Sequence, residues 1–308
     1  MTELTGAAAV VGLIGRPVAH SLSPRMHNRA FAHLGMDWVY VPFEVADDAV
    51  SAALAGVKAL SIRGVNVTVP HKTAVIPFLD ELTPEAAAMG AVNTIVNDSG
   101  RLVGHNTDGS GFVRSLREVA GFDPHGARVL VLGAGGAARA VAIALARAGA
   151  ERVAVANRTE SKARRLAEDV ARHGASSAGL SLAREPLAAE LRAADAVVQT
   201  TSVGMAGDPS LPLDPDLLAP RHLVADIEKL RDMVLSGEIV RVADIVYTPL
   251  KTPLLRAAEA RGCRTLPGWG MLLYQGVEAF ECWTGTPAPA NVMREALLEA
   301  LRGKEAEA

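Results

Sequence analysis

The chain has 308 residues, of which 49% are hydrophobic and 4% aromatic, and its formal net charge is −3. This length and apolar content favour two domains of ordinary size with cores of Ala, Val and Leu. Neither sign of charge forms a long block, no apolar run approaches a membrane span and no export signal is evident, which argues against nucleic-acid and membrane partners and favours a cytoplasmic protein.

Short apolar runs alternate with helical patterns, which predicts βα units and mainly parallel sheets. The elements expected in the first part are strands over Val10–Gly15, Trp38–Val45 and Gly64–Val69, a helix over Pro24–Leu34, and a hairpin of Asn93–Val96 and Arg101–Val103 around Asp98-Ser99-Gly100. A helix over Phe112–Val119 then leads into Gly121–Pro124, which we interpret as a linker.

After this linker the βα pattern restarts. The expected strands are Arg128–Leu132, Arg152–Ala156, Ala196–Thr200 and Val240–Val246, and the expected helices are Ala137–Ala148, Ser161–His173 and Pro253–Arg261. The sequence therefore predicts an α/β fold of two domains, the first over residues 1–112 and a doubly wound, Rossmann-like one over residues 113–285. A last helix, over about residues 286–308, is a candidate to pack back on the first domain, although its sequence alone does not place it there.

The tetrapeptide Val224–Ile227 recurs as Val242–Ile245, with the polar segment Glu228–Glu238 between the two copies. A small duplication or insertion explains the repeat, and so does chance in a chain rich in Ala and Val. Which copy forms the strand also stays open.

A glycine-rich turn follows the strand Arg128–Leu132 and opens the next helix. It reads Gly133-Ala134-Gly135-Gly136-Ala137. Gly133 permits a tight turn, and Gly135 lets the backbone approach a pyrophosphate, which the N–H groups of a helix N-terminus can bind. The strand–turn–helix setting predicts a dinucleotide site.

The following strand ends in Asn157-Arg158-Thr159, with Lys162 one turn later. An NAD-binding fold usually carries an acidic side chain here for the ribose hydroxyls, whereas Arg158 would attract a 2′-phosphate. This pattern favours NADP as the cofactor; the alternative is a solvated, basic helix start.

Polar residues also follow the strands of the first domain. Ser21 and Ser23 lie two residues apart between a strand and a helix, so in an extended segment their hydroxyls share a face. Ser23 also sits where a helix N-cap belongs. If Val65, Val67 and Val69 are buried, the intervening Asn66 and Thr68 point to the other face of their strand. Lys72, Asn93 and Asp108 lie near other strand ends. So many polar groups beside apolar strands are costly unless they converge on a polar ligand.

These segments together resemble the shikimate dehydrogenase family. The matching segments are His20–Pro24, Asn66–Lys72, Gly90–Thr94, Asn106–Gly109, Gly133–Ala137, Asn157–Thr159, Val246–Pro249, Thr252–Leu255 and Gly268–Gly276. They occur in order over about residues 12 to 285. The resemblance implies an N-terminal substrate domain, a Rossmann-like NADP-binding domain and the reversible, NADPH-dependent reduction of 3-dehydroshikimate to shikimate.

The resemblance also implies roles for individual residues. The implied substrate ligands are Ser21, Ser23 and Tyr247 for the carboxylate, and Asn66, Thr68, Asn93 and Gln275 for the ring hydroxyls. Lys72 and Asp108 are the implied catalytic pair. The implied cofactor ligands are Gly133, Ala134, Gly135, Gly136 and Ala137 for the pyrophosphate, Asn157, Arg158, Thr159 and Lys162 for the adenosine phosphate, and Thr201, Ser202, Ile245, Gly268 and Met271 on the nicotinamide side.

The chain departs from the family pattern in two places. It has Gln199-Thr200-Thr201-Ser202 where the family usually has Asn-Ala-Thr-Ser, which can alter the packing behind the nicotinamide. The segment Glu228–Glu238 lengthens the stretch before Tyr247, which puts the roles of Ile245 and Tyr247 in doubt.

In the implied reaction Lys72 supplies a proton and positive charge to the developing alkoxide, and Asp108 orients both the lysine and the hydroxyl. The histidines near the motifs lack metal spacing, and Cys263 and Cys282 lie far apart. We therefore expect no metal and no disulfide. The expected partner is a small molecule, with the chain a monomer or homodimer. The alternatives are an NAD-dependent quinate or shikimate dehydrogenase, a catalytically silent NADP or shikimate sensor, and a dehydrogenase for a folate or an amino acid.

Overall fold

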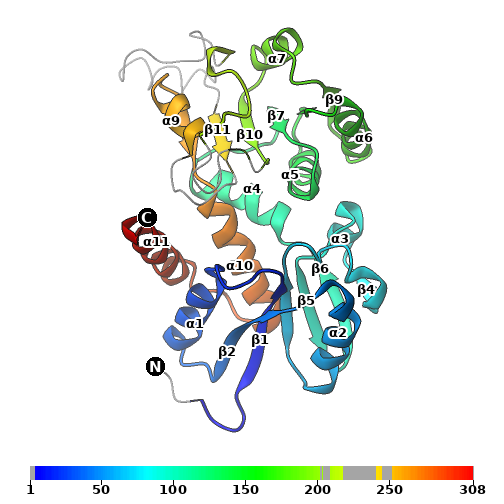
Figure 1. Ribbon diagram of the computed structural model, residues 1–308, viewed down its shortest axis with the longest axis vertical. Helices are drawn as coiled ribbons and strands as arrows, with labels where there is room; N and C mark the ends of the chain where they lie inside the picture. The colour runs from blue at the N-terminus through cyan, green and yellow to red at the C-terminus, as the bar shows by residue number, and fades with distance from the viewer. Residues whose placement is uncertain (1–3, 202, 204–208, 218–240, 245–251, 308) are drawn as a thin grey trace. The chain divides into compact units, whose positions relative to one another are not determined.

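The structure is a computed structural model, and it describes residues 4–201, 203, 209–217, 241–244 and 252–307. The chain divides into two compact units, one formed by Met1–Gly111 with Leu273–Ala308 and the other by Phe112–Leu272 (Figure 1). Each unit has a six-stranded sheet of its own. The helices α4 (Asp108–Glu118) and α10 (Trp269–Thr284) each cross a boundary between the units along the chain.

The first unit is built on a mixed sheet with the strand order β2-β1-β3-β5-β6-β4. Its strands are β1 (Ala9–Gly15), β2 (Trp38–Glu44), β3 (Gly64–Val67), β4 (Glu81–Leu82), β5 (Thr94–Asp98) and β6 (Arg101–His105). β1 is parallel to β2 and β3, whereas β5 is antiparallel to β3 and β6. The predicted hairpin is therefore present, and Ser99 and Gly100 at its turn both have positive φ. Because β1 and β3 are parallel, the loops that follow them leave the sheet at the same edge.

Helices cover both faces of this sheet. They are α1 (Ser23–His33), α2 (Val50–Ala59), α3 (Pro84–Met89), the last part of α10 and α11 (Ala290–Glu307), with 3-10 turns over Asp47–Ala49 and Ile76–Phe78. Figure 1 shows α1 and α2 on opposite sides of β1. Leu54 and Val57 of α2 share one buried cluster with Val65 and Val67 of β3. On the other face, Trp283 of α10 donates to the carbonyl of Ile95 in β5 at 3.0 Å.

Strand β3 ends two residues earlier than its apolar pattern predicts. Val65 and Val67 are buried, as expected, but Val69 is 65% exposed. Asn66 is buried as well, because both faces of β3 are covered. The last ladder pair of β3 and β1 is Val67 with Ile14. Beyond it, Thr68 donates its backbone N–H to the carbonyl of Ile14 and Val69 accepts from the N–H of Arg16 at 3.1 Å, but the regular ladder has ended.

The second unit is a fully parallel sheet in the order β12-β11-β10-β7-β8-β9, which is the doubly wound pattern. Its strands are β7 (Arg128–Leu132), β8 (Arg152–Ala156), β9 (Ser176–Leu180), β10 (Ala196–Gln199), β11 (Arg241–Asp244) and β12 (Arg264–Leu266). β11 contains Val242, Ala243 and Asp244 of the second copy of the repeated tetrapeptide and pairs with both β10 and β12. The first copy, Val224–Ile227, and the segment Glu228–Glu238 lie outside the described residues.

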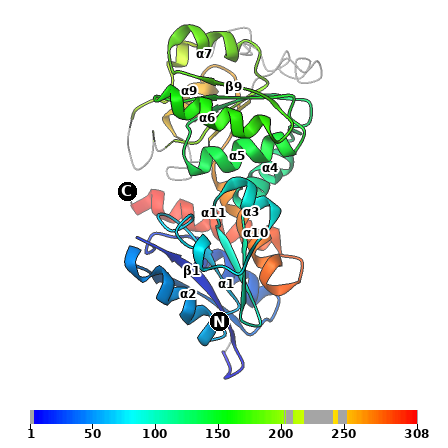
Figure 2. The same ribbon diagram turned by 90° about the vertical axis from the view of Figure 1, so that its right-hand side faces the viewer.

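Helices α5 (Gly136–Arg147) and α6 (Glu160–Ala171) lie side by side on one face of this sheet (Figure 2). On the other face, α7 (Arg184–Leu191), α9 (Pro253–Glu259) and a 3-10 turn over Pro215–Leu217 form a buried cluster with alternate residues of β7, β8 and β10. Right-handed crossovers place successive connections in this way. No helix in the described part of the chain is long and apolar enough to span a bilayer.

Candidate active site

Lys72 and Asp108 meet in the first unit. The Nζ atom of Lys72 lies 2.6 Å from Oδ2 of Asp108, and the carboxylate side chain is 12% exposed against 32% for the lysine. Asp108 is the first residue of α4, where the helix dipole stabilises a negative charge. Lys72 lies in the loop that follows β3. The backbone carbonyl of Lys72 accepts a hydrogen bond from the N–H of Val92 at 2.8 Å, which fixes this loop. A partly exposed ammonium is thus held against a buried carboxylate.

Asn93 fixes the second oxygen of that carboxylate. Its Nδ2 donates to Oδ1 of Asp108 at 2.9 Å and to Oγ1 of Thr107 at 3.0 Å, while its Oδ1 accepts from the backbone N–H of Thr107 at 2.8 Å. The side chain is buried. The amide and the ammonium therefore hold opposite oxygens of Asp108, which leaves the carboxylate little freedom to rotate.

Gln275 lies beside this cluster because α4 and α10 pack closely within the unit. A Cβ atom at Gly111 would come within 2.5 Å of the backbone nitrogen of Gln275, so only glycine permits this approach. The hydroxyl of Thr107 donates to the carbonyl of Gln275 at 3.0 Å. Thr107, which the sequence argument did not single out, thus joins Asn93 to α10.

Asn66 and Thr68 come from β3 and the loop after it. Asn66 is buried, and its Nδ2 donates to the carbonyl of Asn93 at 3.2 Å and to Oγ1 of Thr94 at 3.0 Å. Thr68 is half-buried. Its methyl carbon would lie only 2.3 Å from a Cβ atom added at Gly15, the last residue of β1. The loop after β1 and the loop after β3 are therefore in contact.

The two predicted serines lie at the start of α1. Ser23 is the first helical residue, with Leu22 at the N-cap position and no side-chain cap. Its expected role as an N-cap is therefore wrong, and its hydroxyl is left for other partners. Oγ of Ser21 accepts from the backbone N–H of Ser23 at 3.3 Å. Both serines thus sit at a helix N-terminus, which favours anions.

The glycine-rich turn in the second unit has the geometry its sequence predicts. Gly133 has φ of +116°, and a Cβ atom there would lie 2.5 Å from Oγ1 of Thr200. Gly135 is the N-cap of α5, and Cβ atoms at Gly135 and Gly136 would meet open space. The backbone N–H groups at the start of α5 are therefore open to a ligand, and Ala134 and Ala137 lie on either side of Gly135 and Gly136.

The segment after β8 is open too. Asn157 is half-buried and donates through Nδ2 to the carbonyl of Thr159 at 3.0 Å, which shapes the turn into α6. Arg158, Thr159 and Lys162 are exposed. Among the described residues, neither Arg158 nor Lys162 has an ion-pair partner, so both charges are available to a phosphate.

The departure at Gln199 and Thr200 has a structural counterpart. The buried Gln199 donates through Nε2 to Oγ1 of Thr201 at 2.8 Å and to the carbonyl of Val203 at 3.1 Å. Thr200 donates to the carbonyl of Leu132 at 2.6 Å, directly before Gly133. Gln199 and Thr200 therefore brace the loop after β10 and the glycine turn.

Other predicted site residues are placed less fully. Gly268, directly before α10, is buried, and Met271, in its first turn, is half-buried; both belong to the second unit. Ser202, Ile245 and Tyr247 lie outside the described residues. Within the described part of the chain, no three His, Cys, Asp or Glu side chains are grouped to hold a metal ion.

Sequence reasoning missed Tyr40, a buried residue of β2. Its hydroxyl donates to Oδ1 of Asn66 at 2.8 Å, and the ring of His27 stacks on it with centroids 4.5 Å apart. Burial lowers the pKa of His27 to about 3, so this histidine is neutral at pH 7. An aromatic residue in a strand ordinarily fills a core, so nothing in the sequence marked Tyr40 as part of a polar network.

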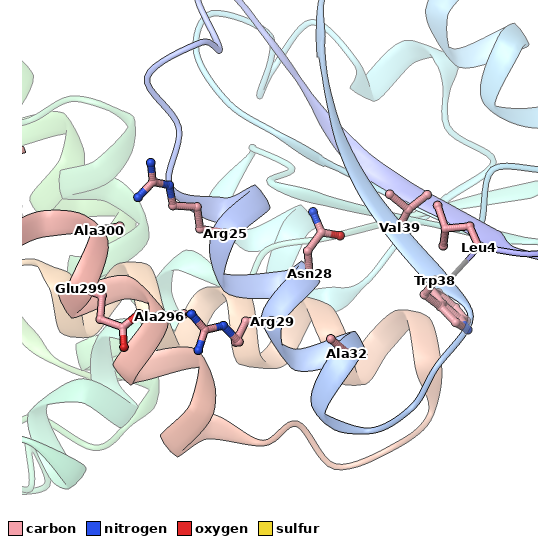
Figure 3. Close-up of a pocket in the computed structure, with 10 residues that line it drawn as sticks. All are labelled: Leu4, Arg25, Asn28, Arg29, Ala32, Trp38, Val39, Ala296, Glu299 and Ala300. Atoms are coloured by element: carbon pink, nitrogen blue, oxygen red, sulfur yellow. Dashed lines mark hydrogen bonds and ion pairs between the residues drawn. The ribbon is translucent and has the colours of Figure 1, made fainter. Parts of the chain in front are cut away.

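A surface groove of the first unit lies elsewhere, between α1, β2 and α11 (Figure 3). Arg25, Asn28 and Trp38 line it, and Arg29 forms an ion pair there with Glu299 at 3.2 Å. None of the described lining residues belongs to the predicted site. The groove is therefore separate from the Lys72–Asp108 cluster.

Comparison with known proteins identifies the family. Residues 13–95 match the shikimate dehydrogenase substrate binding domain, residues 116–206 the shikimate / quinate 5-dehydrogenase family, and residues 268–298 the shikimate 5′-dehydrogenase C-terminal domain. A shikimate dehydrogenase (NADP(+)) of Moorella thermoacetica is 49% identical over 98% of this chain and 96% of its own length. The chain belongs to the shikimate dehydrogenase family.

Solved structures of this family have the same fold. Shikimate 5-dehydrogenase of Listeria monocytogenes, in complex with shikimate and NAD, is 40% identical with a TM-score of 0.86 and covers 96% of this chain and 99% of its own. The Thermus thermophilus enzyme, in complex with NADP(H) and shikimate, is 38% identical with a TM-score of 0.81 over 95% and 100% of the two chains. The predicted two-domain α/β fold and the resemblance to shikimate dehydrogenase are confirmed.

Proposed function

We propose that this protein is an NADP-dependent shikimate dehydrogenase, which interconverts 3-dehydroshikimate and shikimate by hydride transfer. The observation that carries the proposal is the contact of 2.6 Å between Nζ of Lys72 and Oδ2 of Asp108 in a member of this family. Reduction of a ketone needs a proton donor beside the carbonyl oxygen, and a lysine ammonium supplies both the proton and positive charge.

Lys72 and Asp108 divide the acid–base work. In the reducing direction Lys72 gives a proton to the oxygen that gains negative charge, and in the oxidising direction it takes that proton back. Asp108 holds the ammonium and accepts a hydrogen bond from the reacting hydroxyl. Asn93 keeps Oδ1 of Asp108 fixed, so Oδ2 stays directed toward Lys72.

The substrate lies against polar groups of the first unit. Ser21 and Ser23, at the N-terminus of α1, bind the carboxylate, and Tyr247 is assigned to the same group from its sequence motif alone. Asn66, Thr68, Asn93 and Gln275 surround the ring hydroxyls. All these side chains except Tyr247 belong to the described first unit, which also holds Lys72 and Asp108.

The glycine turn fits a dinucleotide. A Cβ atom at Gly133 would collide with Thr200, whereas the space above Gly135 and Gly136 is open, so the N–H groups at the start of α5 can bind a pyrophosphate. Bound NADPH supplies the hydride. Thr201, Gly268 and Met271 are assigned to the nicotinamide side, together with Ser202 and Ile245.

The cofactor is NADP rather than NAD because of the charges after β8. Arg158 and Lys162 are exposed cations without ion-pair partners in the described part of the chain, and Asn157 and Thr159 add polar groups beside them. A 2′-phosphate gains charge-assisted hydrogen bonds there. The 2′-hydroxyl of NAD is uncharged and does not gain these interactions.

An absorbance assay at the reduced-nicotinamide band tests the proposal, with shikimate or quinate offered with NADP or NAD. We expect rapid reduction only with shikimate and NADP. Preference for quinate and NAD would support the alternative dehydrogenase, and ligand binding without turnover would support a sensor. A monomer or homodimer in the cytoplasm is proposed with this function.

A further inference from the structure

Gln199 is the last residue of β10, and its side chain is fully buried. Its Oε1 accepts from the backbone N–H of Thr201 at 3.0 Å, while its Nε2 donates to Oγ1 of Thr201 at 2.8 Å and to the carbonyl of Val203 at 3.1 Å. If the amide were turned over, its NH₂ group would face the N–H of Thr201 and its oxygen would face the carbonyl of Val203. These two backbone groups therefore fix the NH₂ group, and not the oxygen, against the threonine hydroxyl.

The hydroxyl of Thr201 already accepts two hydrogen bonds. One comes from Nε2 of Gln199, and the other comes from the backbone N–H of Val203 at 3.2 Å. A hydroxyl has two lone pairs and one proton, so any further partner of this oxygen must accept its proton. No described residue accepts that proton, and Thr201 is only half-buried. The hydroxyl is thus a hydrogen-bond donor with its proton left for a ligand.

Thr201 lies beside the glycine turn of the second unit. A Cβ atom at Gly133 would come within 3.1 Å of the methyl carbon of Thr201 and within 2.5 Å of Oγ1 of Thr200. Oγ1 of Thr200 donates to the carbonyl of Leu132, the last residue of β7, which is the strand next to β10 (Figure 1). The donor hydroxyl is therefore held against the turn that leads into α5, where the proposed function puts the cofactor.

We propose that Gln199 is a positioning residue that commits the hydroxyl of Thr201 to donate a hydrogen bond to the bound cofactor. Because Gln199 is fully buried, it acts through Thr201 and does not contact the cofactor itself. The inference rests on the proposed function for the identity of the cofactor, and it gives a role to a position at which this chain departs from the usual family pattern. The partner of Thr201 is an acceptor oxygen of NADP, either on the nicotinamide carboxamide or on the riboses and phosphates.

Replacement of the amide by a carboxylate of the same shape tests this role. In Gln199→Glu an oxygen takes the place of the NH₂ group, so it accepts the proton of Thr201 and turns that proton away from the cofactor. Thr201→Val removes the hydroxyl and keeps the branched shape. The readout is the Kd of NADP⁺, measured by calorimetry without substrate. Each variant should raise this Kd about three- to tenfold, which is the effect of one neutral hydrogen bond, and further if the acceptor is a charged phosphate.

A double variant separates this role from simple support of the loop. Because Gln199 acts through the hydroxyl, Gln199→Glu should weaken binding less than about twofold beyond Thr201→Val. Thr201→Ser keeps the hydroxyl and should bind NADP⁺ within about twofold of the wild type. If Gln199 only supported the loop, the effects of Gln199→Glu and Thr201→Val would multiply in the double variant.

Asn97→Asp is the matched control. Asn97 is a buried amide of the first unit, and its Nδ2 also donates to two carbonyls, those of Val57 and Ile62. Its replacement should lower stability and leave the Kd of NADP⁺ unchanged.

The same titrations with 2′-phospho-ADP-ribose, which lacks the nicotinamide, locate the acceptor oxygen. If Gln199→Glu and Thr201→Val weaken NADP⁺ alone, the acceptor is the carboxamide. If they weaken both ligands equally, it lies on the riboses or phosphates. Either result supports the proposal.

Two results would overturn the inference: an unchanged Kd of NADP⁺ in Gln199→Glu, or effects that multiply in the double variant. If Gln199→Glu does not fold, equal Kd values for Thr201→Val, Thr201→Ser and the wild type would overturn it instead. Binding of NADP⁺ without turnover of shikimate would refute the proposed function and leave this test intact. Turnover with multiplying effects would refute the role of Gln199 alone, and no binding of NADP⁺ would refute both.

Discussion

Nζ of Lys72 and Oδ2 of Asp108 lie 2.6 Å apart although 36 positions separate the two residues in the chain. Lys72 follows β3, and Asp108 begins α4 directly after the β5–β6 hairpin. Because β5 pairs with β3, the hairpin returns the chain to the end of β3. The pairing of these strands therefore brings Lys72 and Asp108 together.

The first prediction concerns this pair. Lys72→Ala should lower kcat by roughly 10²–10⁴-fold with a modest change in the KM for shikimate, because it removes the group that accepts the proton in this direction but not the substrate ligands. Steady-state kinetics with NADP measures both constants. Lys58→Ala is the control, since Lys58 forms a more exposed ion pair with Asp80 at 2.8 Å. An unchanged kcat in Lys72→Ala would exclude the assigned role.

The second prediction concerns the cofactor charge. Arg158→Gln should raise the KM for NADP about 10- to 100-fold, since a hydrogen bond to a charged group contributes about 1.5–3 kcal/mol. The KM for NAD, which has no 2′-phosphate, should stay the same. Arg165→Gln is the matched control, because Arg165 is an exposed arginine of α6 that has no assigned cofactor contact. Equal changes for the two cofactors would show that Arg158 does not bind the phosphate.

The third prediction concerns the glycine turn. Gly133→Ala places a Cβ atom 2.5 Å from the Thr200 hydroxyl at a φ of +116°, so the turn must shift. We expect a loss of NADP binding and a stability cost of about 1–3 kcal/mol. Gly174→Ala separates these effects, because Gly174 has φ of +103° but faces open space. It should lower the melting temperature and leave the Kd for NADP unchanged, and equal weakening by both variants would contradict a local role.

The fourth prediction concerns pH. Burial lowers the pKa of His27 from 6.5 to about 3, so between these values the unfolded chain binds a proton that the folded chain does not. Stability from this group is present above pH 6.5 and is lost as the pH falls, by about 2 kcal/mol at pH 5. Urea denaturation at pH 8 and pH 5 measures the loss.

His27→Phe should reduce the pH dependence of stability. The control His33→Gln, at an exposed position, should leave that dependence unchanged. An unchanged difference between pH 8 and pH 5 in His27→Phe would show that His27 is not the group that titrates.

Much of the site could be predicted because its residues lie in local motifs at the ends of strands. Lys72, Asn93 and Asp108 each follow or precede a short apolar run, and parallel or hairpin pairing brings such ends together. The glycine turn was predictable for the same local reason. The strands β7 and β8 were predicted with the bounds that the structure gives, since buried parallel strands read as continuous apolar runs.

Other features depend on contacts that no local pattern shows. Tyr40 has the sequence signature of a core residue, and only the fold places its hydroxyl on Asn66. β9 lies at the edge of its sheet, and its residues are only partly buried or exposed, so its apolar pattern is weak. The second crossing between the units falls inside α10, after Leu272, whereas the predicted domain limit was residue 285. A continuous helix contains no linker residues that would reveal such a crossing.

The first unit is interrupted in the chain, since Leu273–Ala308 completes it after the whole second unit has been made. On a ribosome, the sheet that Trp283 reaches through the Ile95 carbonyl must wait, with the face that α1 shares with α10 only partly covered, for the last segment to emerge. The second unit is contiguous and can finish folding earlier. We therefore expect the second unit to complete its fold before the first, although the first unit begins the chain. A nascent chain released before its final helices are made should be prone to aggregate.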